Sequence, residues 1–407
     1  MDEPVGLHAR QKYREVLEAG PATRPLDFPP PRVRPGVRVN ALVVHPQTGT
    51  RQVCSGVIHR EDLDGSSEAL AYWPQRRLQD AIYGSVWACL VLRRHFGVAA
   101  DDAARAAGVQ PGSPNAPVVW EITEGRHVAV KMVEWARVHR MRGRLLEDPV
   151  KEVAAMQMLG STPHPHVLGT MEVLQDGECL YSIMPYCRDG DLFGVVVEHA
   201  EENGGEIGMA EPVARYWFRQ ILWGLHHLQS EGICHRDLSL ENVLVNGDVC
   251  MIIDMGMCLR VPYDDGAGAV TDVHKGVIRR LIKPQGVCGK HNYMSPEVFA
   301  NSEDFDGFAI DLWAAGVVLY IMLTGFPPYD QASRADKRYE LIVTGKLVEQ
   351  LRNWDIYLSD EVGHLLQAML QEDPKRRLTL AEVLEHPWVI NEDVQAPASA
   401  ASLGYRR

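Results

Sequence analysis

The chain changes texture near Gly190, and this change limits the folds that it can adopt. Before that point, apolar residues gather in short runs rich in Val and Ala, which are typical of β-strands. After it they recur every three or four residues, which is typical of amphipathic α-helices. A strand-rich half followed by a helical half predicts an α+β fold, with a small antiparallel sheet and a larger, mainly helical unit.

The strand-rich half has recognisable strands separated by an irregular stretch. We expect strands over residues 86–92, 118–123, 126–133 and 179–186. A tight turn at Glu124 and Gly125 is predicted to join the second strand to the third. Residues 93–116 are rich in Ala, Gly, Pro and Asp and are interpreted as a surface insert.

One helix is predicted inside the strand-rich half, over residues 149–159. Asp148 followed by Pro149 is typical of a helix start, and Gly160 is typical of a helix end. Glu152 lies on the same helix face as Met156, so we expect its carboxylate to point toward whatever that face packs against.

The helical half contains a loop with unusual polar content. Helices are expected over residues 212–229, 308–323, 358–370 and 380–385. Between the first two lies the stretch Cys234-His-Arg-Asp-Leu-Ser-Leu-Glu-Asn-Val-Leu-Val245, where charged and amide side chains alternate with apolar ones.

The two ends of the chain are predicted to lie outside the main domain. Residues 1–74 are interpreted as an N-terminal extension with a short helix over 9–19 and a hairpin from strands near 41–44 and 52–58. Pro29 to Pro31 favour polyproline geometry, which predicts a stiff spacer or, alternatively, a segment that binds a partner of the SH3 type. Residues 391–407, rich in Ala and Ser, are predicted to form a disordered tail.

Composition excludes several classes of partner. The 407 residues are 46% hydrophobic, which is enough for substantial cores, and the net charge of −13 disfavours broad binding to nucleic acid or anionic membranes. The 8 cysteines show no pairing pattern, the start lacks a signal region, and the apolar run 308–323 is short and contains Asp311. We therefore expect a cytoplasmic protein, with the nucleus as the alternative, and neither nucleic acid nor membrane as a partner.

Five polar residues together indicate phosphoryl transfer, although each alone has an ordinary structural explanation. This reaction needs a cation on the nucleotide phosphates, a partner for that cation, an acceptor for the substrate's hydroxyl proton and oxygen ligands for Mg²⁺. The chain supplies these in order as Lys131, Glu152, Asp237, Asn242 and Asp254.

These residues and their neighbours resemble the eukaryotic protein kinase family, over residues 78–390. The resemblance rests on Val128-Ala-Val-Lys131, His235-Arg-Asp237 with Asn242, Asp254-Met-Gly256, Ser295-Pro-Glu297, Asp311-Leu-Trp313 with Gly316, and Arg377, which is expected to pair with Glu297. The stretch 378–388 is similar to the calmodulin-dependent-like branch of Ser/Thr kinases. A bilobal fold is therefore implied, with a kinase domain over 75–390, a small lobe of five antiparallel strands over 75–187 and a helical lobe over 188–390.

The resemblance also implies ATP and Mg²⁺ as cofactors. Lys131, held by Glu152, would bind the α- and β-phosphates, Asp237 would accept the hydroxyl proton, and Asn242 and Asp254 would bind Mg²⁺. The residues expected around the nucleotide are Gly84, Val86, Ala129, Lys131, Met184, Tyr186, Cys187, Asp191, Leu244 and Asp254.

The chain departs from the family pattern at two sites. Gln79 and Ala81 replace two glycines of the phosphate-binding loop, where backbone amides must approach the phosphates closely. Ser239 stands where the family has a lysine, and Lys290 stands where it has a threonine. Our hypothesis is that Lys290 reaches back beside Asp237 and supplies the missing charge, with Ser239 as its hydrogen-bonding neighbour. The alternative is that Lys290 faces solvent.

Substrate and regulation are less constrained by the sequence. Asp191 and Glu241 match positions that imply a protein substrate with basic residues near the target Ser or Thr. If phosphorylation controls residues 254–297, we expect it at Thr271 or Tyr263. The competing hypotheses are a scaffold without useful catalysis, favoured by the lost glycines and Ser239, and a kinase that acts on a lipid or small molecule.

Overall fold

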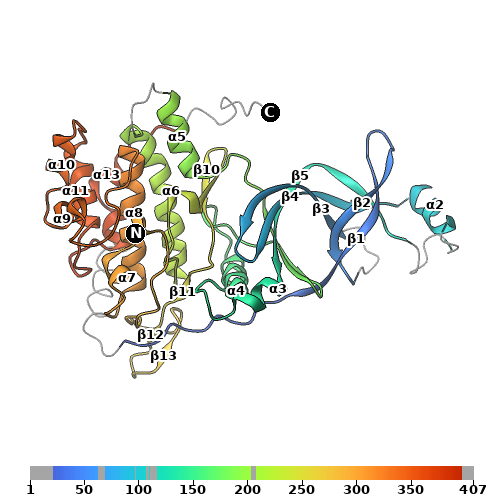
Figure 1. The fold of residues 1–407 in the computed structure, drawn as a ribbon, viewed down its shortest axis with the longest axis horizontal. Helices are drawn as coiled ribbons and strands as arrows, with labels where there is room; N and C mark the ends of the chain where they lie inside the picture. Colours follow the sequence, from blue (N-terminus) through green and yellow to red (C-terminus); the bar gives the residue numbers. More distant parts are fainter. Residues whose placement is uncertain are drawn as a thin grey trace, which may run out of the picture.

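The computed structural model describes residues 22–62, 69–96, 98–106, 110, 117–202 and 208–396, which form a small and a large lobe (Figure 1). The small lobe consists of β1 (Arg34–Val44), β2 (Arg51–Arg60), β3 (Leu70–Ala81), β4 (Gly84–Arg94), α2 (Val98–Ala106), β5 (Val119–Glu134), α3 (Trp135–Met141), α4 (Pro149–Gly160), β6 (Glu172–Gln175) and β7 (Cys179–Pro185). The bilobal α+β architecture is the one that the sequence predicted.

The large lobe is mainly helical, as expected. Its helices are α5 (Leu192–Glu202), α6 (Glu211–Ser230), α7 (Pro296–Ala300), α8 (Gly307–Thr324), α9 (Lys337–Val343), α10 (Leu347–Asn353), α11 (Asp360–Met369), α12 (Leu380–Leu384) and α13 (Pro387–Ile390). Short strands lie between α6 and α7: β8 (Ile233–Cys234), β9 (Val243–Asn246), β10 (Val249–Ile252), β11 (Leu259–Arg260), β12 (Tyr263–Asp264), β13 (Val270–Thr271) and β14 (Ile278–Arg279).

The sheet of the small lobe is larger than predicted, and it is closed. The five antiparallel strands expected in the small lobe are present as β3-β4-β5-β7-β6. Strands β1 and β2 extend them to seven in the order β1-β2-β3-β4-β5-β7-β6, and β1 also pairs in parallel with β5 and β6. The β1–β2 hairpin, expected as a separate addition, supplies the closing strand. Strand β3 runs through residue 74, where the sequence indicated the start of the kinase domain, so the strands that precede this point, β1 and β2, belong to the barrel together with β3.

The tight turn expected at Glu124 and Gly125 is also wrong, because β5 is a single strand. Leu92 pairs with Ile122 and Leu90 pairs with His127, so residues 123–126 bulge out within the strand. Gly125 has φ +68°, a backbone conformation that glycine adopts without strain. The signal that resembled a hairpin turn was therefore that of a β-bulge.

Sequence predictions were also made for the segments that form α2 and α4. The stretch interpreted as a surface insert contains α2, whose buried Ala99 packs against Val44 and Val119 at one end of the barrel. Helix α4 begins at Pro149, as predicted, and ends at Gly160. The Asp148 carboxylate accepts hydrogen bonds from the amides of Val150 and Lys151, at 2.9 and 3.2 Å.

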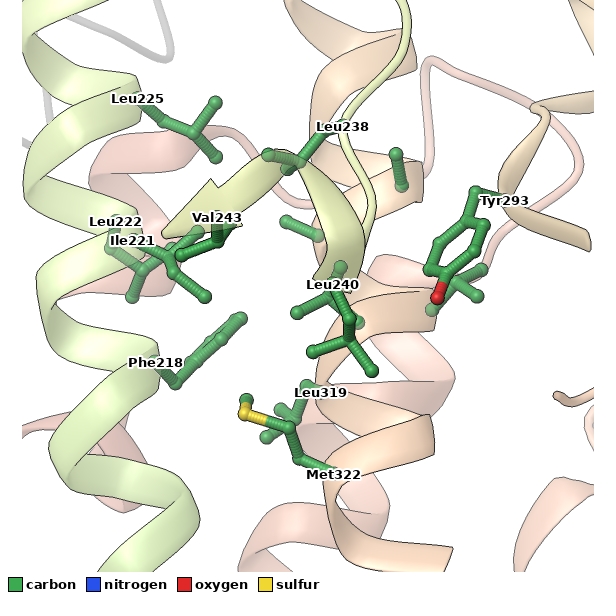
Figure 2. Close-up of a cluster of buried hydrophobic side chains, with 14 of the residues drawn as sticks. Phe218, Ile221, Leu222, Leu225, Leu238, Leu240, Val243, Tyr293, Leu319 and Met322 are labelled. Carbon is green, nitrogen blue, oxygen red and sulfur yellow. The ribbon is translucent and has the colours of Figure 1, made fainter. Parts of the chain in front are cut away.

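The core of the large lobe is built around α6 and α8. Every residue of α8 is buried, so this helix, although long and apolar enough to cross a membrane, serves here as the core of the lobe. Figure 2 shows apolar side chains of α6 and α8 converging on Leu238, Leu240 and Val243 of the polar loop noted in the sequence. These buried side chains anchor the loop from below.

The ends of the described chain are attached to this framework. Gln395 donates its amide to the carbonyl of Pro212 at 3.2 Å, and Arg219 donates to the carbonyl of Asn391 at 2.6 Å, so residues 391–396 lie along α6. The helix expected over residues 9–19, and residues 397–407 of the expected tail, lie outside the described residues.

Candidate active site

A cavity of about 310 Å³ lies between the lobes and collects most of the residues predicted to surround a nucleotide. Its lining includes Val86, Ala129, Lys131, Glu152, Met184, Tyr186, Cys187, Asp191, Leu244 and Asp254. These residues come from β4, β5, α4, β7 and the segment after it, β9 and the segment after β10, and only the fold brings them together. The cavity thus has apolar walls with charged groups at one end, which suits a ligand that combines a flat ring with phosphates.

Lys131 and Glu152 form a buried ion pair. The Lys131 Nζ donates to both carboxylate oxygens of Glu152 at 2.7 Å, and Glu152 is only 4% exposed. Burial alone would lower the pKa of Lys131, but the charges of Glu152 and Asp254 raise it above its ordinary value, so the ammonium stays charged. Helix α4 is therefore docked with its carboxylate on the lysine.

Asp237 is held in one orientation by two hydrogen bonds. Its Oδ1 accepts the amide of Lys290 at 3.2 Å, and its Oδ2 accepts the Nδ2 of Asn242 at 3.1 Å. The same nitrogen of Asn242 also donates to the Asp237 carbonyl at 2.7 Å. The short loop between Asp237 and Asn242 is consequently closed on itself, with both side chains fixed.

The backbone before Asp237 is fixed by a buried carboxylate of α8. Asp311 accepts the amides of His235 and Arg236 at 2.6 and 2.8 Å, and burial raises its pKa to about 6. Arg236 has φ +67°, which is unfavourable for a side chain of this type and which these two hydrogen bonds help to maintain. The strain is placed directly beside Asp237.

The structure places Lys290 beside Ser239, as the hypothesis of an exchanged pair requires. The Lys290 Nζ donates to the Ser239 Oγ at 2.7 Å, and Ser239 is fully buried. Burial raises the pKa of Asp237, and Lys290 is the strongest of the charges that oppose this rise. The same ammonium lies 3.9 Å from Glu241. Lys290 is thus turned toward the catalytic loop instead of facing away from it.

Asp254 follows β10 and also has a strained backbone, with φ +66°. Its Oδ1 accepts the amide of Gly256 at 3.1 Å, and its side chain lines the cavity that contains Lys131. Met255, which stands at the position of a phenylalanine in the resemblance, is fully buried in the main core. Its flexible side chain fills that apolar slot and leaves Asp254 directed to the cleft.

Gly84 is the one predicted nucleotide residue that does not line the cavity. A Cβ added at this position would lie 1.8 Å from the carbonyl oxygen of Met132, so the glycine allows β4 to approach β5. The cavity wall is formed instead by Gln79, together with Arg76, whose Nη2 donates to the Tyr186 hydroxyl at 3.0 Å. The sequence analysis missed Arg76, since nothing in its neighbourhood marks it as a cleft residue.

A second predicted ion pair fixes the far side of the site. Arg377 lies 2.9 Å from Glu297 and also donates to the carbonyl of Ala309 at 2.8 Å. The arginine side chain is fully buried, so its charge is balanced by a carboxylate and by carbonyl groups. Arg377, which lies between α11 and α12, thus bridges Glu297 of α7 and Ala309 of α8, and the ion pair confirms the contact expected from the sequence.

Comparison with known proteins agrees with this geometry. The protein kinase domain family matches residues 116–389. Serine/threonine-protein kinase DCLK3 of Mus musculus is 33% identical over 263 residues, which cover 64% of this chain and 29% of that protein. CBL-interacting protein kinase 16 of Oryza sativa subsp. japonica is 29% identical over 272 residues, 66% of this chain and 52% of that protein. Sperm motility kinase 2A of Mus musculus is 32% identical over 270 residues, 65% of this chain and 45% of that protein.

The chain therefore spans between 29% and 52% of the length of these relatives. The family match nevertheless covers more than half of the chain and includes Lys131, Glu152, Asp237, Asn242 and Asp254. The sequence pattern, the two-lobed fold and the match agree, and the chain belongs to the protein kinase family.

Proposed function

We propose that the chain is a Ser/Thr protein kinase that transfers the γ-phosphate of ATP to hydroxyl groups of proteins. The observation that carries the proposal is the buried Lys131–Glu152 pair, which lines the same cavity as Asp254. A buried cation held at the charged end of an open cavity has a clear chemical use when phosphates enter that cavity.

Different residues of the cavity are assigned to the adenine ring, the phosphates and the ribose. The adenine ring is assigned to the apolar walls formed by Val86, Ala129 and Leu244, with Met184 at the back and Tyr186 and Cys187 along the connection between the lobes. The α- and β-phosphates are assigned to Lys131, which Glu152 keeps in place. Asp191, at the outer edge, is assigned to the ribose or to a basic substrate residue.

Asn242 and Asp254 are the residues that would hold Mg²⁺, which prefers oxygen ligands and retains waters. The Asn242 amide nitrogen donates twice to Asp237, so within the described chain its amide oxygen is left for a cation. When bound, Mg²⁺ neutralises charge on the transferring phosphoryl group. The oxygen donors present fit this ion.

Asp237 is proposed to accept the proton of the attacking hydroxyl, and Lys290 to balance the charge of the transferred phosphate. The Asp237 carboxylate is fixed by Lys290 and Asn242, which prepares it for one orientation of the substrate. Lys290 is tied to Ser239, and its side chain remains 39% exposed. A point charge is sufficient for phosphate.

The substrate is proposed to be a protein segment with basic residues near the target Ser or Thr. Glu241 supports this, because its carboxylate lies beside the catalytic loop, accepts the Tyr293 hydroxyl at 3.3 Å and is still 37% exposed. An acidic residue at this place attracts a basic peptide. A cytoplasmic or nuclear location, without nucleic acid or membrane as partners, remains a prediction from composition.

Phosphate transfer tests the proposal directly. The purified chain would be incubated with Mg²⁺, ATP labelled in the γ-phosphate and a library of basic Ser and Thr peptides, beside the Asp237→Asn variant. We expect incorporation by the wild type and a loss of at least about a thousandfold in the variant. ATP binding by both proteins without transfer by either would instead favour the scaffold hypothesis, which Gln79 and Ala81 motivate.

A further inference from the structure

Residues 22–33, which we call the inter-lobe strap, cross from the large lobe to the barrel beneath α4 (Figure 1). Thr23 donates its amide to the carbonyl of Leu281 at 3.1 Å and accepts the amide of Lys283 at 3.0 Å. Leu26 donates to the carbonyl of Arg260 at 2.9 Å, and Arg260 donates through Nη1 to the carbonyl of Asp27 at 3.0 Å. The strap thus pairs with residues 254–297 at two places.

These contacts lead into the catalytic loop through backbone pairing. Arg260 belongs to β11, which pairs with β8 through Arg260–Ile233 and Leu259–Cys234. Strand β8 directly precedes His235, and Asp237 is three residues beyond its end. The strap therefore forms a bridge to β11, one of the two strands of the small sheet that positions the start of the catalytic loop.

The other end of the strap is attached to α4, the helix that carries Glu152. The side chain of Gln157 accepts the Arg32 amide at 2.8 Å and donates to the Arg32 carbonyl at 2.7 Å. Phe28 packs against the main core, and Val33 packs against the cluster that contains Val153. One short segment thus joins α4 and residues 254–297 to the same barrel strand, β1.

Residues 254–297 are also ordered by their own charges. Arg280 pairs with Asp264, Arg279 lies 2.5 Å from Asp306, and Arg260 lies 3.4 Å from Asp272. Their short strands form a three-stranded sheet in the order β13-β12-β14. These three arginine side chains are therefore engaged with carboxylates of the chain itself.

Arg236 and one of the two hydroxyl residues predicted for phosphorylation are likewise engaged within the fold. Arg236 donates to the carbonyl of Gly286 at 3.1 Å, and its guanidinium lies over the Phe305 ring, 5.9 Å from the ring centre. Tyr263, one of the two hydroxyl residues predicted for phosphorylation, is only 6% exposed. Thr271 is the more accessible of the two.

We propose that the inter-lobe strap is a positioning element that holds α4 and residues 254–297 in the arrangement needed for transfer, so that assembly of the site does not require phosphorylation of residues 254–297. The proposal rests on the proposed kinase function. Gln157 is its positioning residue, because it fixes the strap to the helix on which Glu152 meets Lys131. The proline run predicted as a spacer or partner ligand is assigned this internal role.

The test removes the two hydrogen bonds between Gln157 and Arg32 by substitution in the full chain. Gln157→Leu keeps helix propensity but cannot bond Arg32, whereas Gln157→Glu retains the acceptor and loses the donor. Gln350→Leu, on α10 far from the strap, is the matched control. We expect Gln157→Leu to lower kcat/KM for ATP about tenfold, with Gln157→Glu between it and the wild type and the control unchanged.

Hydrogen exchange supplies a readout that is independent of activity. In Gln157→Leu, exchange should become faster in α4 and in residues 254–297, while exchange in α8 stays as in the wild type. Equal exchange in Gln157→Leu and Gln350→Leu would overturn the proposal. Because exchange can be measured on a chain without transfer activity, failure of the strap and failure of the kinase proposal are distinguishable.

A second arm tests independence from phosphorylation. The chain would be treated with a phosphatase, checked by intact mass, and assayed beside the Thr271→Ala variant. We expect transfer rates within about twofold of the untreated chain, because no added phosphate is needed to order the segment. A loss of about tenfold or more after treatment would contradict the proposal.

Discussion

The charges at the active site are arranged in pairs whose members come from distant parts of the sequence. Lys131 meets Glu152 across the small lobe, and Lys290 reaches Ser239 from the loop that precedes α7. Both contacts were predicted from sequence. The Lys131–Glu152 contact followed from the family resemblance, and the Lys290–Ser239 contact followed from a cation missing at position 239 and an additional one at position 290. Gly84 was predicted beside the nucleotide but does not line the cavity, and its close approach to the carbonyl of Met132 depends on how β4 and β5 pair, which the sequence does not show.

The buried ion pair predicts a separation between stability and activity. Lys131→Met leaves the Glu152 carboxylate buried without its partner, so we expect a loss of about 3–5 kcal/mol in the free energy of unfolding together with loss of transfer. Lys131→Met/Glu152→Leu removes both charges and should recover most of the stability but none of the activity. Urea unfolding and the transfer assay would be measured together, with Lys346→Met on the surface as control.

Recovery of activity in the double variant would contradict the role assigned to Lys131. Recovery of neither property would indicate that Leu does not fit the position of Glu152, and Glu152→Gln beside the intact lysine would then separate charge from packing.

At the scale of elements, the sequence was most reliable where a local signal fixes the backbone. Helix α4 was located by Asp148 and Pro149, because capping and proline geometry act within a single turn. The bulge of β5 was misread as a turn, since Gly125 in the left-handed region serves either structure and only the pairing with β4 distinguishes them. Closure of the barrel required contacts between residues far apart in sequence.

The β3–β4 hairpin predicts how nucleotide affinity can be improved. Gln79 lines the cavity on β3, directly after an irregularity in the pairing with β4 between Arg77 and Gln79, and a glycine there would let the backbone approach a phosphate more closely. We expect Gln79→Gly/Ala81→Gly to tighten ATP binding by up to about tenfold for each backbone hydrogen bond gained. Its cost should be about 0.5–1 kcal/mol of stability per glycine.

Isothermal titration with ATP and Mg²⁺ would measure this change, and Gln75→Gly, on the same strand outside the cavity, is the control. Unchanged or weaker binding in the double variant, with normal binding in the control, would mean that the hairpin does not approach the phosphates.

A histidine contact between α6 and the segment after α4 predicts a pH dependence of stability. The rings of His164 and His227 stack with centres 4.8 Å apart, and burial lowers the pKa of His164 from 6.5 to about 4. Between pH 6.5 and about 4, His164 therefore binds a proton in the unfolded chain but not in the folded chain. Stability from this contact is complete above pH 6.5 and is lost as the pH falls toward 4.

Urea midpoints at pH 7.5, 6 and 5 would measure this effect in the wild type, in His164→Gln and in His127→Gln, which alters an exposed histidine. We expect His164→Gln to flatten the decline at low pH relative to the other two proteins. Parallel declines in all three proteins would show that His164 does not contribute.

At the scale of the whole molecule, the small lobe extends beyond the family match. The match begins at residue 116, whereas β1 to β4 lie before it and make up more than half of the barrel strands. Residues 34–74 were predicted as a separate extension, because β1 and β2 have no recognisable place in the family pattern. Barrel closure joins them to the catalytic domain, and the inter-lobe strap continues from the same strand to the large lobe.

The strap links the two lobes in addition to the chain connection near Tyr186, and it meets α4, which two contacts within the small lobe also fix. The strap, the Lys131–Glu152 pair and the contact of Tyr83 with the Glu147 carbonyl, at 2.8 Å, all converge on α4 or its start. Local sequence signals predicted α4 itself, but its three attachments depend on long-range packing.

The central claim is that the site transfers phosphate with Lys290 in the role of the cation that Ser239 replaces. The most direct test is the single-turnover rate of phosphate transfer, as a function of pH, in the wild type, Lys290→Thr, Ser239→Lys and Ser239→Lys/Lys290→Thr. We expect Lys290→Thr to lower the rate by about 10- to 100-fold and to move its acid limb to higher pH, because Lys290 opposes the rise in the pKa of Asp237. The double variant should regain most of the rate and most of the wild-type pH profile, since it again places one lysine and one hydroxyl at positions 239 and 290. A full rate in Lys290→Thr, with an unchanged pH profile, would contradict the account.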